Sequence, residues 1–152
     1  MFTVTPAEIE NIYLDETPET AAAVLQPLAE ARNAVAQCYM GHLCDERSPR
    51  DQEGALEWYR RSSAGGCLEG THYFASFIYF GFGTTQNTEE ALRLFRIAAE
   101  AGFDASQWKL GQHFLAIPEH RKEALGWLQR AADQGHELAA KLLAETKNAR
   151  NT

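Results

Sequence analysis

Apolar and small residues recur along the chain with the period of an α-helix, and they do so four times in one pattern. In residues 91–102 (ALRLFRIAAEAG) they occupy relative positions 0, 3, 4, 7, 8 and 11, which form one stripe of a helix that ends in glycine. The same pattern recurs in residues 55–66 and 124–135, and a degraded copy lies in residues 21–32. The four copies start 34, 36 and 33 residues apart. Such spacing indicates a repeat protein.

A second helix is predicted between successive copies of this stripe. Three segments, aligned on Ala36, Gly70 and Ser106, carry a large apolar residue at position 4 and a small residue at position 5. The large residues are Met40, Phe74 and Leu110, and the small ones are Gly41, Ala75 and Gly111. A shorter copy begins at Ala139. Because glycine inside a helix costs about 1 kcal/mol relative to alanine, the small residue predicts a close approach of two backbones.

A further helix is predicted ahead of the repeats. Residues 5–16 (TPAEIENIYLDE) begin with Thr5 as N-cap, Pro6 at the first helical position and Glu8 at the third. We interpret this helix as an N-terminal cap. Inside the degraded copy, Pro27 predicts a kink or a break, because proline cannot donate the helical hydrogen bond.

These patterns resemble the Sel1-like repeat, a relative of the tetratricopeptide repeat. Its sequence runs A-x-x-x-L-G-x-x-Y, then G-x-G, then a polar residue and A-L-x-W-Y-x-x-A-A-x-x-G. The copy in residues 70–102 matches it almost throughout, including Gly81 and Gly83. The resemblance covers about residues 21–146.

The resemblance implies an all-α fold, a right-handed α-solenoid of about three to four helix pairs whose neighbours share a core. The first helix of each pair is expected to line the concave side. We expect a single domain over residues 1–152, made of a cap segment (1–20), the repeats (21–146) and a polar tail (147–152).

Net charge is −7, and residues 1–46 carry all of it with eight acidic residues and one basic residue. Such a segment is either a solvated acidic face or a surface that attracts a basic partner. An acidic chain without a basic stripe argues against nucleic-acid binding. No apolar run is long enough for a membrane span, so no membrane association is expected.

The beginning of the sequence lacks the basic and apolar features of a signal peptide. The chain has three cysteines without the spacing of a metal site, which indicates thiols in a reducing compartment. The expected location is therefore cytoplasmic.

Signals for enzymatic chemistry are weak. Ser106 and Lys109 spell S-x-x-K, a nucleophile motif of penicillin-recognising enzymes, but no S-D-N or K-T-G accompanies them. Ser106 is also the small packing residue of its repeat. The five histidines share no repeat-equivalent position, and HExxH and CxxC are absent. We expect no catalytic residue, no metal and no cofactor.

The first helices of the pairs carry more aromatic residues than one packing stripe needs. Exposed aromatic residues on a concave surface are typical anchors of a protein interface. We therefore predict a groove that holds a protein segment, lined by Tyr39, His42, Tyr73, Phe77, Phe80, Lys109, Gln112 and His113.

The resemblance implies a non-catalytic protein–protein interaction module. A short acidic chain of this kind is similar to bacterial immunity proteins that bind and inhibit a cognate toxin or effector, for which a basic target would suit. The alternatives are an adaptor or regulatory scaffold in signalling or envelope assembly, and a β-lactam-binding or β-lactam-hydrolysing protein. Relatives linked to β-lactams carry a cysteine pair in each repeat, and this chain does not. Either a monomer or a homodimer is expected.

Overall fold

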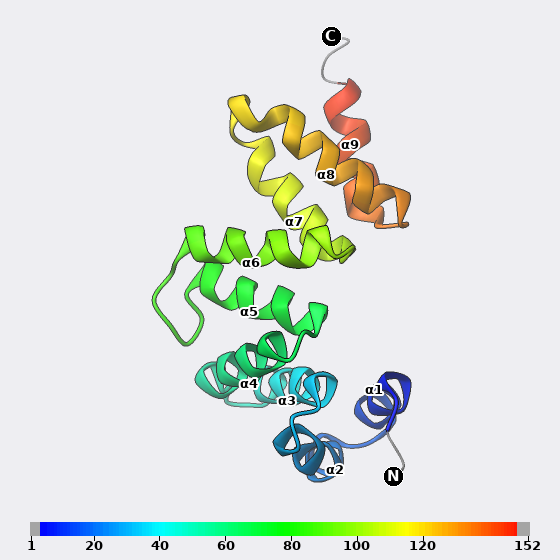
Figure 1. Ribbon diagram of the computed structural model, residues 1–152, viewed down its shortest axis with the longest axis vertical. Coiled ribbons are helices and arrows are strands. Elements are labelled where there is room, and N and C mark those ends of the chain that lie inside the picture. The colour runs from blue at the N-terminus through cyan, green and yellow to red at the C-terminus, as the bar shows by residue number, and fades with distance from the viewer. Residues whose placement is uncertain (1–3, 149–152) are drawn as a thin grey trace. The chain divides into compact units, whose positions relative to one another are not determined.

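The computed structural model describes residues 4–148, and in this range the chain is all-α (Figure 1). The described residues form nine α-helices and one 3₁₀-helix. In order these are α1 (Pro6–Asp15), α2 (Pro18–Glu30), α3 (Ala34–Glu46), α4 (Gln52–Ala64), α5 (Leu68–Phe80), α6 (Thr88–Glu100), α7 (Asp104–Leu115), η1 (Pro118–His120), α8 (Arg121–Asp133) and α9 (Glu137–Asn148). They confirm the all-α helix pairs expected from the sequence.

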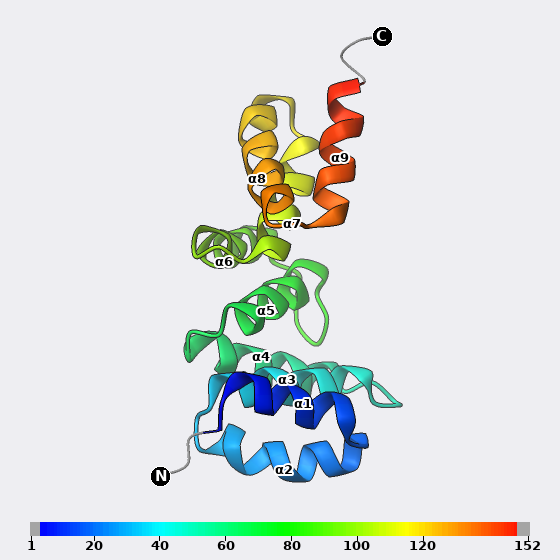
Figure 2. The same ribbon diagram turned by 90° about the vertical axis from the view of Figure 1, so that its right-hand side faces the viewer.

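The chain divides into two compact units, one ending at Ala91 and one beginning at Leu92. In the first unit, α2 packs on α3, α3 on α4 and α4 on α5, and α1 lies against α2 and α3 (Figure 2). In the second unit, α8 packs between α7 and α9. The single domain expected from the sequence stays a prediction. Within the described part of the chain, no helix is long and apolar enough to cross a membrane.

The start of α1 follows the predicted capping chemistry. The Thr5 backbone N–H donates to the Glu8 carboxylate (2.7 Å), and the Glu8 N–H donates to Thr5 Oγ1 (3.3 Å). This reciprocal pair confirms the capping box of α1. The side chains of Asn33 and Asp51 accept in the same way at the starts of α3 and α4.

The helix ends confirm the repeat register. Position 11 has a positive φ in all four copies, at Arg32 (66°), Gly66 (84°), Gly102 (98°) and Gly135 (91°). This left-handed conformation terminates a helix and favours glycine. Arg32 adopts it without that advantage, which is why the first copy looks degraded in sequence.

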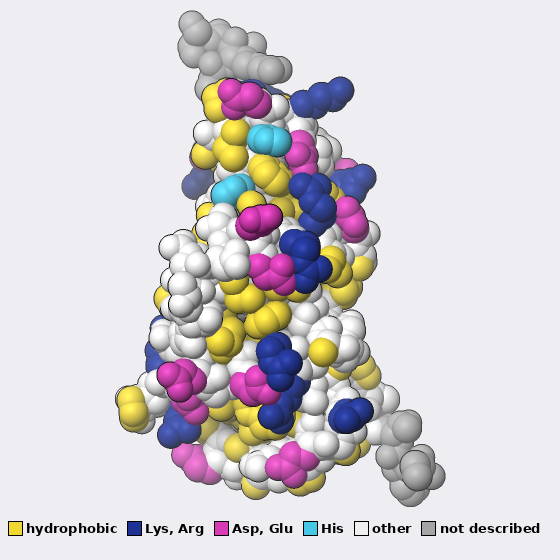
Figure 3. Space-filling view, turned by 60° about the vertical axis from the view of Figure 1, so that its left-hand side comes forward, with side chains coloured by type: hydrophobic (Ala, Val, Ile, Leu, Met, Phe, Trp, Pro, Cys, Tyr) yellow, Lys and Arg dark blue, Asp and Glu magenta, His cyan; other side chains and the backbone are white. Residues whose placement is uncertain are grey.

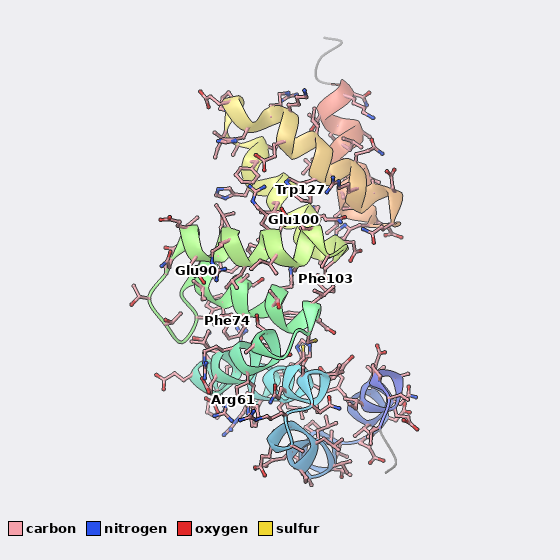
Figure 4. The ribbon with its side chains drawn as sticks, viewed as in Figure 1. Arg61, Phe74, Glu90, Glu100, Phe103 and Trp127 are labelled. Atoms are coloured by element: carbon pink, nitrogen blue, oxygen red, sulfur yellow. The ribbon has the colours of Figure 1, made fainter. Side chains whose placement is uncertain are left out.

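The stripe that defines the repeat is the buried face of each helix. The residues at positions 0 and 4 are fully buried in every copy: Ala21, Leu25, Ala55, Tyr59, Ala91, Phe95, Ala124 and Leu128. Trp127 (Figure 4) extends the same face of α8, and its indole N–H donates to Glu123 (3.3 Å). The break expected at Pro27 is wrong, because α2 continues to Glu30. The missing N–H of Pro27 removes one helical hydrogen bond, to the carbonyl of Ala23, without ending the helix.

The small residue at position 5 marks a close approach between helices, as predicted. A Cβ atom on Gly41 would lie 2.5 Å from the Tyr59 ring, and one on Gly111 would lie 2.6 Å from Leu128 Cγ. Both neighbours are fully buried. Glycine therefore allows α3 to pack on α4, and α7 on α8, at a separation that a methyl group would prevent.

Candidate functional site

A pocket of about 250 Å³ in the first unit brings together tyrosines, a histidine and carboxylates from three helices. The packing of α1 and α5 against α3 places these side chains around one hollow. Its lining consists of Glu10, Tyr13 and Leu14 from α1, Tyr39, His42 and Glu46 from α3, and Glu69 and Tyr73 from α5. We call it the acidic tyrosine pocket.

The aromatic rings of the pocket pack on one another. The ring centroids of Tyr13 and Tyr39 are 4.9 Å apart, and those of His42 and Tyr73 are 4.6 Å apart in an edge-on arrangement. The Tyr13 hydroxyl donates to Glu46 (2.7 Å), which ties α1 to α3. The hollow therefore has walls whose orientation is fixed by contacts within the pocket itself.

His42 is the centre of a polar cluster at this site. Its Nδ1 atom is hydrogen-bonded to the Tyr59 hydroxyl (2.9 Å), and Tyr59 is fully buried. Its Nε2 atom lies 3.2 Å from Glu69 Oε1 and 3.7 Å from the sulfur of Cys38. The His42 side chain is only 12% exposed. Both ring nitrogens thus have partners that hold the ring in one orientation.

The pocket is an acidic environment. Burial raises the pKa of Tyr13, Tyr39 and Tyr73, and nearby carboxylates add to the effect, so these phenols stay neutral at physiological pH. Three glutamates line the hollow, and its lining includes no lysine or arginine. The arrangement favours a positively charged guest.

Two thiols lie next to the pocket. A hydrogen bond with Cys67 and burial raise the pKa of the Cys38 thiol. The same hydrogen bond, together with the N–H of Gly70, lowers the pKa of Cys67 to about 6. Cys67 is the N-cap residue of α5. The two cysteines therefore lie together between α3 and the start of α5.

Some opposite charges elsewhere on the surface are paired. Arg60 and Arg61 donate to Glu57 at 2.8 and 2.7 Å. The face in Figure 3 likewise shows basic and acidic side chains next to one another. A second hollow of about 490 Å³ is lined partly by Arg60 and Arg61 (Figure 4 labels Arg61) and by Arg32. Because Glu57 is already paired with two of these guanidiniums and Glu30 also lines the hollow, it is a weaker candidate for a charged ligand.

The structure brings together three of the predicted groove residues and corrects one. Tyr39, His42 and Tyr73 line the acidic tyrosine pocket. Phe77 is only 3% exposed and packs with Tyr59 in the core, so its prediction as a groove residue is wrong. The reason is that α5 contacts both α3 and α4, which buries a wider arc of the helix than one stripe.

Phe80 lies at the end of α5 and is 50% exposed, with its ring stacked on Phe82 at 5.4 Å. It is exposed, as predicted, but it does not line the acidic tyrosine pocket.

The remaining predicted residues, Lys109, Gln112 and His113, lie on α7 in the second unit. Burial lowers the pKa of Lys109, whose ammonium lies 5.8 Å from the Trp108 ring centre. Gln112 is exposed and His113 is half-buried. A single groove formed by all eight residues stays a prediction. Ser106 is fully buried, as expected of a packing residue.

Sequence reasoning missed five lining residues: Glu10, Tyr13, Leu14, Glu46 and Glu69. The acidic bias of residues 1–46 signalled some of them. Tyr13 and its neighbours lie in α1, which matches no repeat, so no register could assign them to a face.

Comparison with known proteins places the helix pairs in a family. The Sel1 repeat model matches residues 34–67, 72–103 and 104–136, which correspond to α3–α4, α5–α6 and α7–α8. The chain is 30% identical over 135 residues to the uncharacterized protein NMB1327 of Neisseria meningitidis serogroup B. That match covers 88% of this chain but 28% of the relative, so the chain spans under a third of the relative's length.

Two solved structures are similar to it. The Sel1 repeat protein of Oxalobacter formigenes has a TM-score of 0.81 at 20% identity, over 91% of this chain and 59% of that one. The c5321 protein, a protective antigen present in uropathogenic Escherichia coli strains and displaying an SLR fold, has a TM-score of 0.83 at 26% identity. That match covers 91% of this chain and 32% of c5321. Because the family model matches well over half of its residues, the chain belongs to the Sel1 repeat family.

Proposed function

We propose that this chain is a non-catalytic protein-interaction module whose acidic tyrosine pocket receives an arginine or lysine side chain of a basic partner. The observation that carries the proposal is the lining of that pocket: three tyrosines, one histidine and three glutamates, with no lysine or arginine among them.

The chemistry of the lining suits a cation in two ways. Tyrosine faces attract guanidinium and ammonium groups by about 0.5–2 kcal/mol, more when water is excluded. Carboxylates add charge-assisted hydrogen bonds, which for arginine can be bidentate. The pocket volume of about 250 Å³ lies just below the ~300–1,000 Å³ typical of small-molecule sites. A single inserted side chain therefore suits it better than a free ligand.

The finer proposal concerns the partner. Residues 1–46 carry the entire net charge of −7, and α1 and α3 contribute most of the pocket from this segment. Such a field speeds the approach of a positively charged protein. A basic toxin or effector is a partner of this kind, and the chain would then act as its immunity protein by occupying the toxin's surface.

The test compares two charge-matched double variants. Glu10→Gln/Glu46→Gln neutralises two carboxylates of the pocket, and Asp15→Asn/Glu16→Gln neutralises two that are exposed and outside it. The probe is a fluorescent peptide of alternating arginine and glycine, followed by fluorescence anisotropy at low and physiological salt.

We expect the pocket variant to bind at least about tenfold more weakly, because loss of one charge-assisted contact costs about 1.5 kcal/mol or more. The control variant should lose only the small part of the peptide affinity that depends on salt. Equal losses in the two variants would show a diffuse attraction without a site. The two variants are then used to capture partners from lysate. A partner specific to the pocket should be captured by the control variant and not by the pocket variant.

A further inference from the structure

Three potential metal ligands from two helices converge at the acidic tyrosine pocket, and two of them, His42 and Glu69, belong to its lining. The sulfur of Cys38, Nε2 of His42 and a carboxylate oxygen of Glu69 all lie within 4.8 Å of one another. Cys38 and His42 are one helical turn apart on α3, and Glu69 is in the first turn of α5. Cys38 is fully buried, while Glu69 reaches solvent.

Two of the three separations, those from His42 to Cys38 and to Glu69, are those of ligands around one small cation. Zinc binds cysteine sulfur at about 2.3 Å, histidine nitrogen at about 2.0–2.1 Å and carboxylate oxygen at about 2.0–2.2 Å. A tetrahedral arrangement then separates sulfur from nitrogen by about 3.6 Å and nitrogen from oxygen by about 3.4 Å. The observed separations are 3.7 Å for Cys38 to His42 and 3.2 Å for His42 to Glu69.

The second ring nitrogen of His42 is held as metal-binding histidines usually require. Such residues hydrogen-bond through the nitrogen that does not face the metal, which fixes the tautomer and the ring orientation. Here the buried Tyr59 hydroxyl is hydrogen-bonded to Nδ1 (2.9 Å), so Nε2 faces Cys38 and Glu69. The close packing of the Tyr59 ring on Gly41 holds that hydroxyl in place.

Charge balance also favours a divalent cation. Cys38 is fully buried, and a buried thiolate without a cation beside it is costly. A coordinated metal replaces the thiol proton. The thiolate of Cys38 and the carboxylate of Glu69 then carry two negative charges against two positive ones.

We propose that Cys38, His42 and Glu69 form a zinc site in the first unit. Sulfur, imidazole and carboxylate ligands at this spacing match zinc rather than the all-oxygen sites of calcium or magnesium. The sequence predicted no metal because HExxH and CxxC were absent, yet a Cys-x-x-x-His spacing on one helix provides two ligands. His42 and Glu69 also line the acidic tyrosine pocket, but the test of this proposal uses the chain and the metal alone, so its outcome does not depend on partner binding.

The test is a titration of the tag-free, chelator-treated and reduced protein with Co²⁺. Cobalt in a tetrahedral site with a thiolate gives a sulfur-to-metal charge-transfer band and intense visible bands. We expect one equivalent of Co²⁺ to produce both, and Zn²⁺ to abolish them. The charge-transfer band should vanish in Cys38→Ala and persist in the matched control Cys44→Ala, whose thiol lies outside the cluster.

Two milder variants keep the test decisive if Cys38→Ala fails to fold. Glu69→Gln changes a partly exposed side chain and should weaken binding and alter the visible bands. Tyr59→Phe keeps the ring and removes the hydroxyl on Nδ1, and it should weaken binding about 10–100-fold. The proposal is overturned if the parent chain gives no cobalt band, or if Glu69→Gln and Tyr59→Phe both bind like the parent while circular dichroism shows them folded.

Discussion

The packing role of Gly111 can be tested by comparing it with Gly126, a glycine in the same unit. Gly111 is in the interior of α7, and Gly126 is in the interior of the neighbouring helix α8. Replacing either residue with alanine gains about 1 kcal/mol from helix propensity. The surroundings differ: a Cβ on Gly126 meets no atom within 4 Å. We therefore expect Gly126→Ala to raise the free energy of unfolding by about 1 kcal/mol.

At Gly111 the new methyl group collides with the core. Its Cβ would lie 2.6 and 2.7 Å from Leu128 Cγ and Cδ2, and 3.2 Å from the carbonyl oxygen of Ala124. Leu128 is fully buried and Ala124 presents its backbone, so neither can yield freely. Such overpacking costs about 1–3 kcal/mol. Because the propensity gain is common to both variants, their difference isolates this cost, and Gly111→Ala should be less stable than Gly126→Ala by about 1–3 kcal/mol.

The assay is urea unfolding of both variants and the parent, followed by far-ultraviolet circular dichroism and tryptophan fluorescence. Heating gives a second measure, since 1 kcal/mol corresponds to about 2–4 °C for a chain of this length. The two sites belong to the same unit, so they report on the same unfolding transition. Equal stabilisation by both substitutions would refute the conclusion that the small residue at position 5 of the first helix, here Gly111, sets the separation from the second helix.

Three further predictions concern other positions of the repeat. Arg32→Gly should raise the free energy of unfolding by about 1 kcal/mol in urea, because Arg32 holds a φ of 66° that glycine adopts without penalty; a loss of stability would contradict this. Gln107→Ala should lower it by about 1–3 kcal/mol, because the buried Gln107 amide donates to a carbonyl in the last turn of α6; an unchanged urea midpoint would count against it. Hydrogen bonds from Arg60 and Arg61 lower the pKa of Glu57 to about 2, although burial opposes them. The stability from this exposed cluster, about 0.2–1 kcal/mol, is present above about pH 4.5 and lost towards pH 2, and a carboxyl titration midpoint near 4.5 by NMR would refute it.

The sequence predicted the packing of the helices well because packing is what the repeat encodes. Positions 0 and 4 of the stripe in α2, α4, α6 and α8 are buried in every copy because each of these helices presents the same face to its neighbours. The two corrections have a common origin. Pro27 and Phe77 were both judged from rules for a single helix, but α2 continues through Pro27 to Glu30, and α5 has a second neighbour that buries Phe77.

The site could not be predicted in the same way because its residues meet only in the folded chain. Glu10 and Tyr13 come from a helix outside the repeat, and Glu69 lies 27 residues from His42, its partner across α3 and α5. Single-sequence periodicity assigns a face to each helix, but it does not specify which side chains of three helices point into one hollow. Two signals survived this limitation: the acidic bias of residues 1–46, and the aromatic and polar positions of the first helices that predicted Tyr39, His42 and Tyr73.

A comparison of the repeat copies shows where function is to be sought. In the first helices of the pairs, counted from Ala36, Gly70 and Ser106, the copies agree in carrying a small residue at position 5, because the helix separation depends on it. At position 2 they carry Cys38, His72 and Trp108, and at position 6 they carry His42, Ser76 and Gln112. Helix packing places no common demand on these positions, so each copy can use them for a different chemistry. The first copy alone combines a thiol at position 2 with an imidazole at position 6, and α1 supplies the acidic tyrosine wall beside them. The differences among the copies, rather than the pattern they share, therefore locate the candidate site.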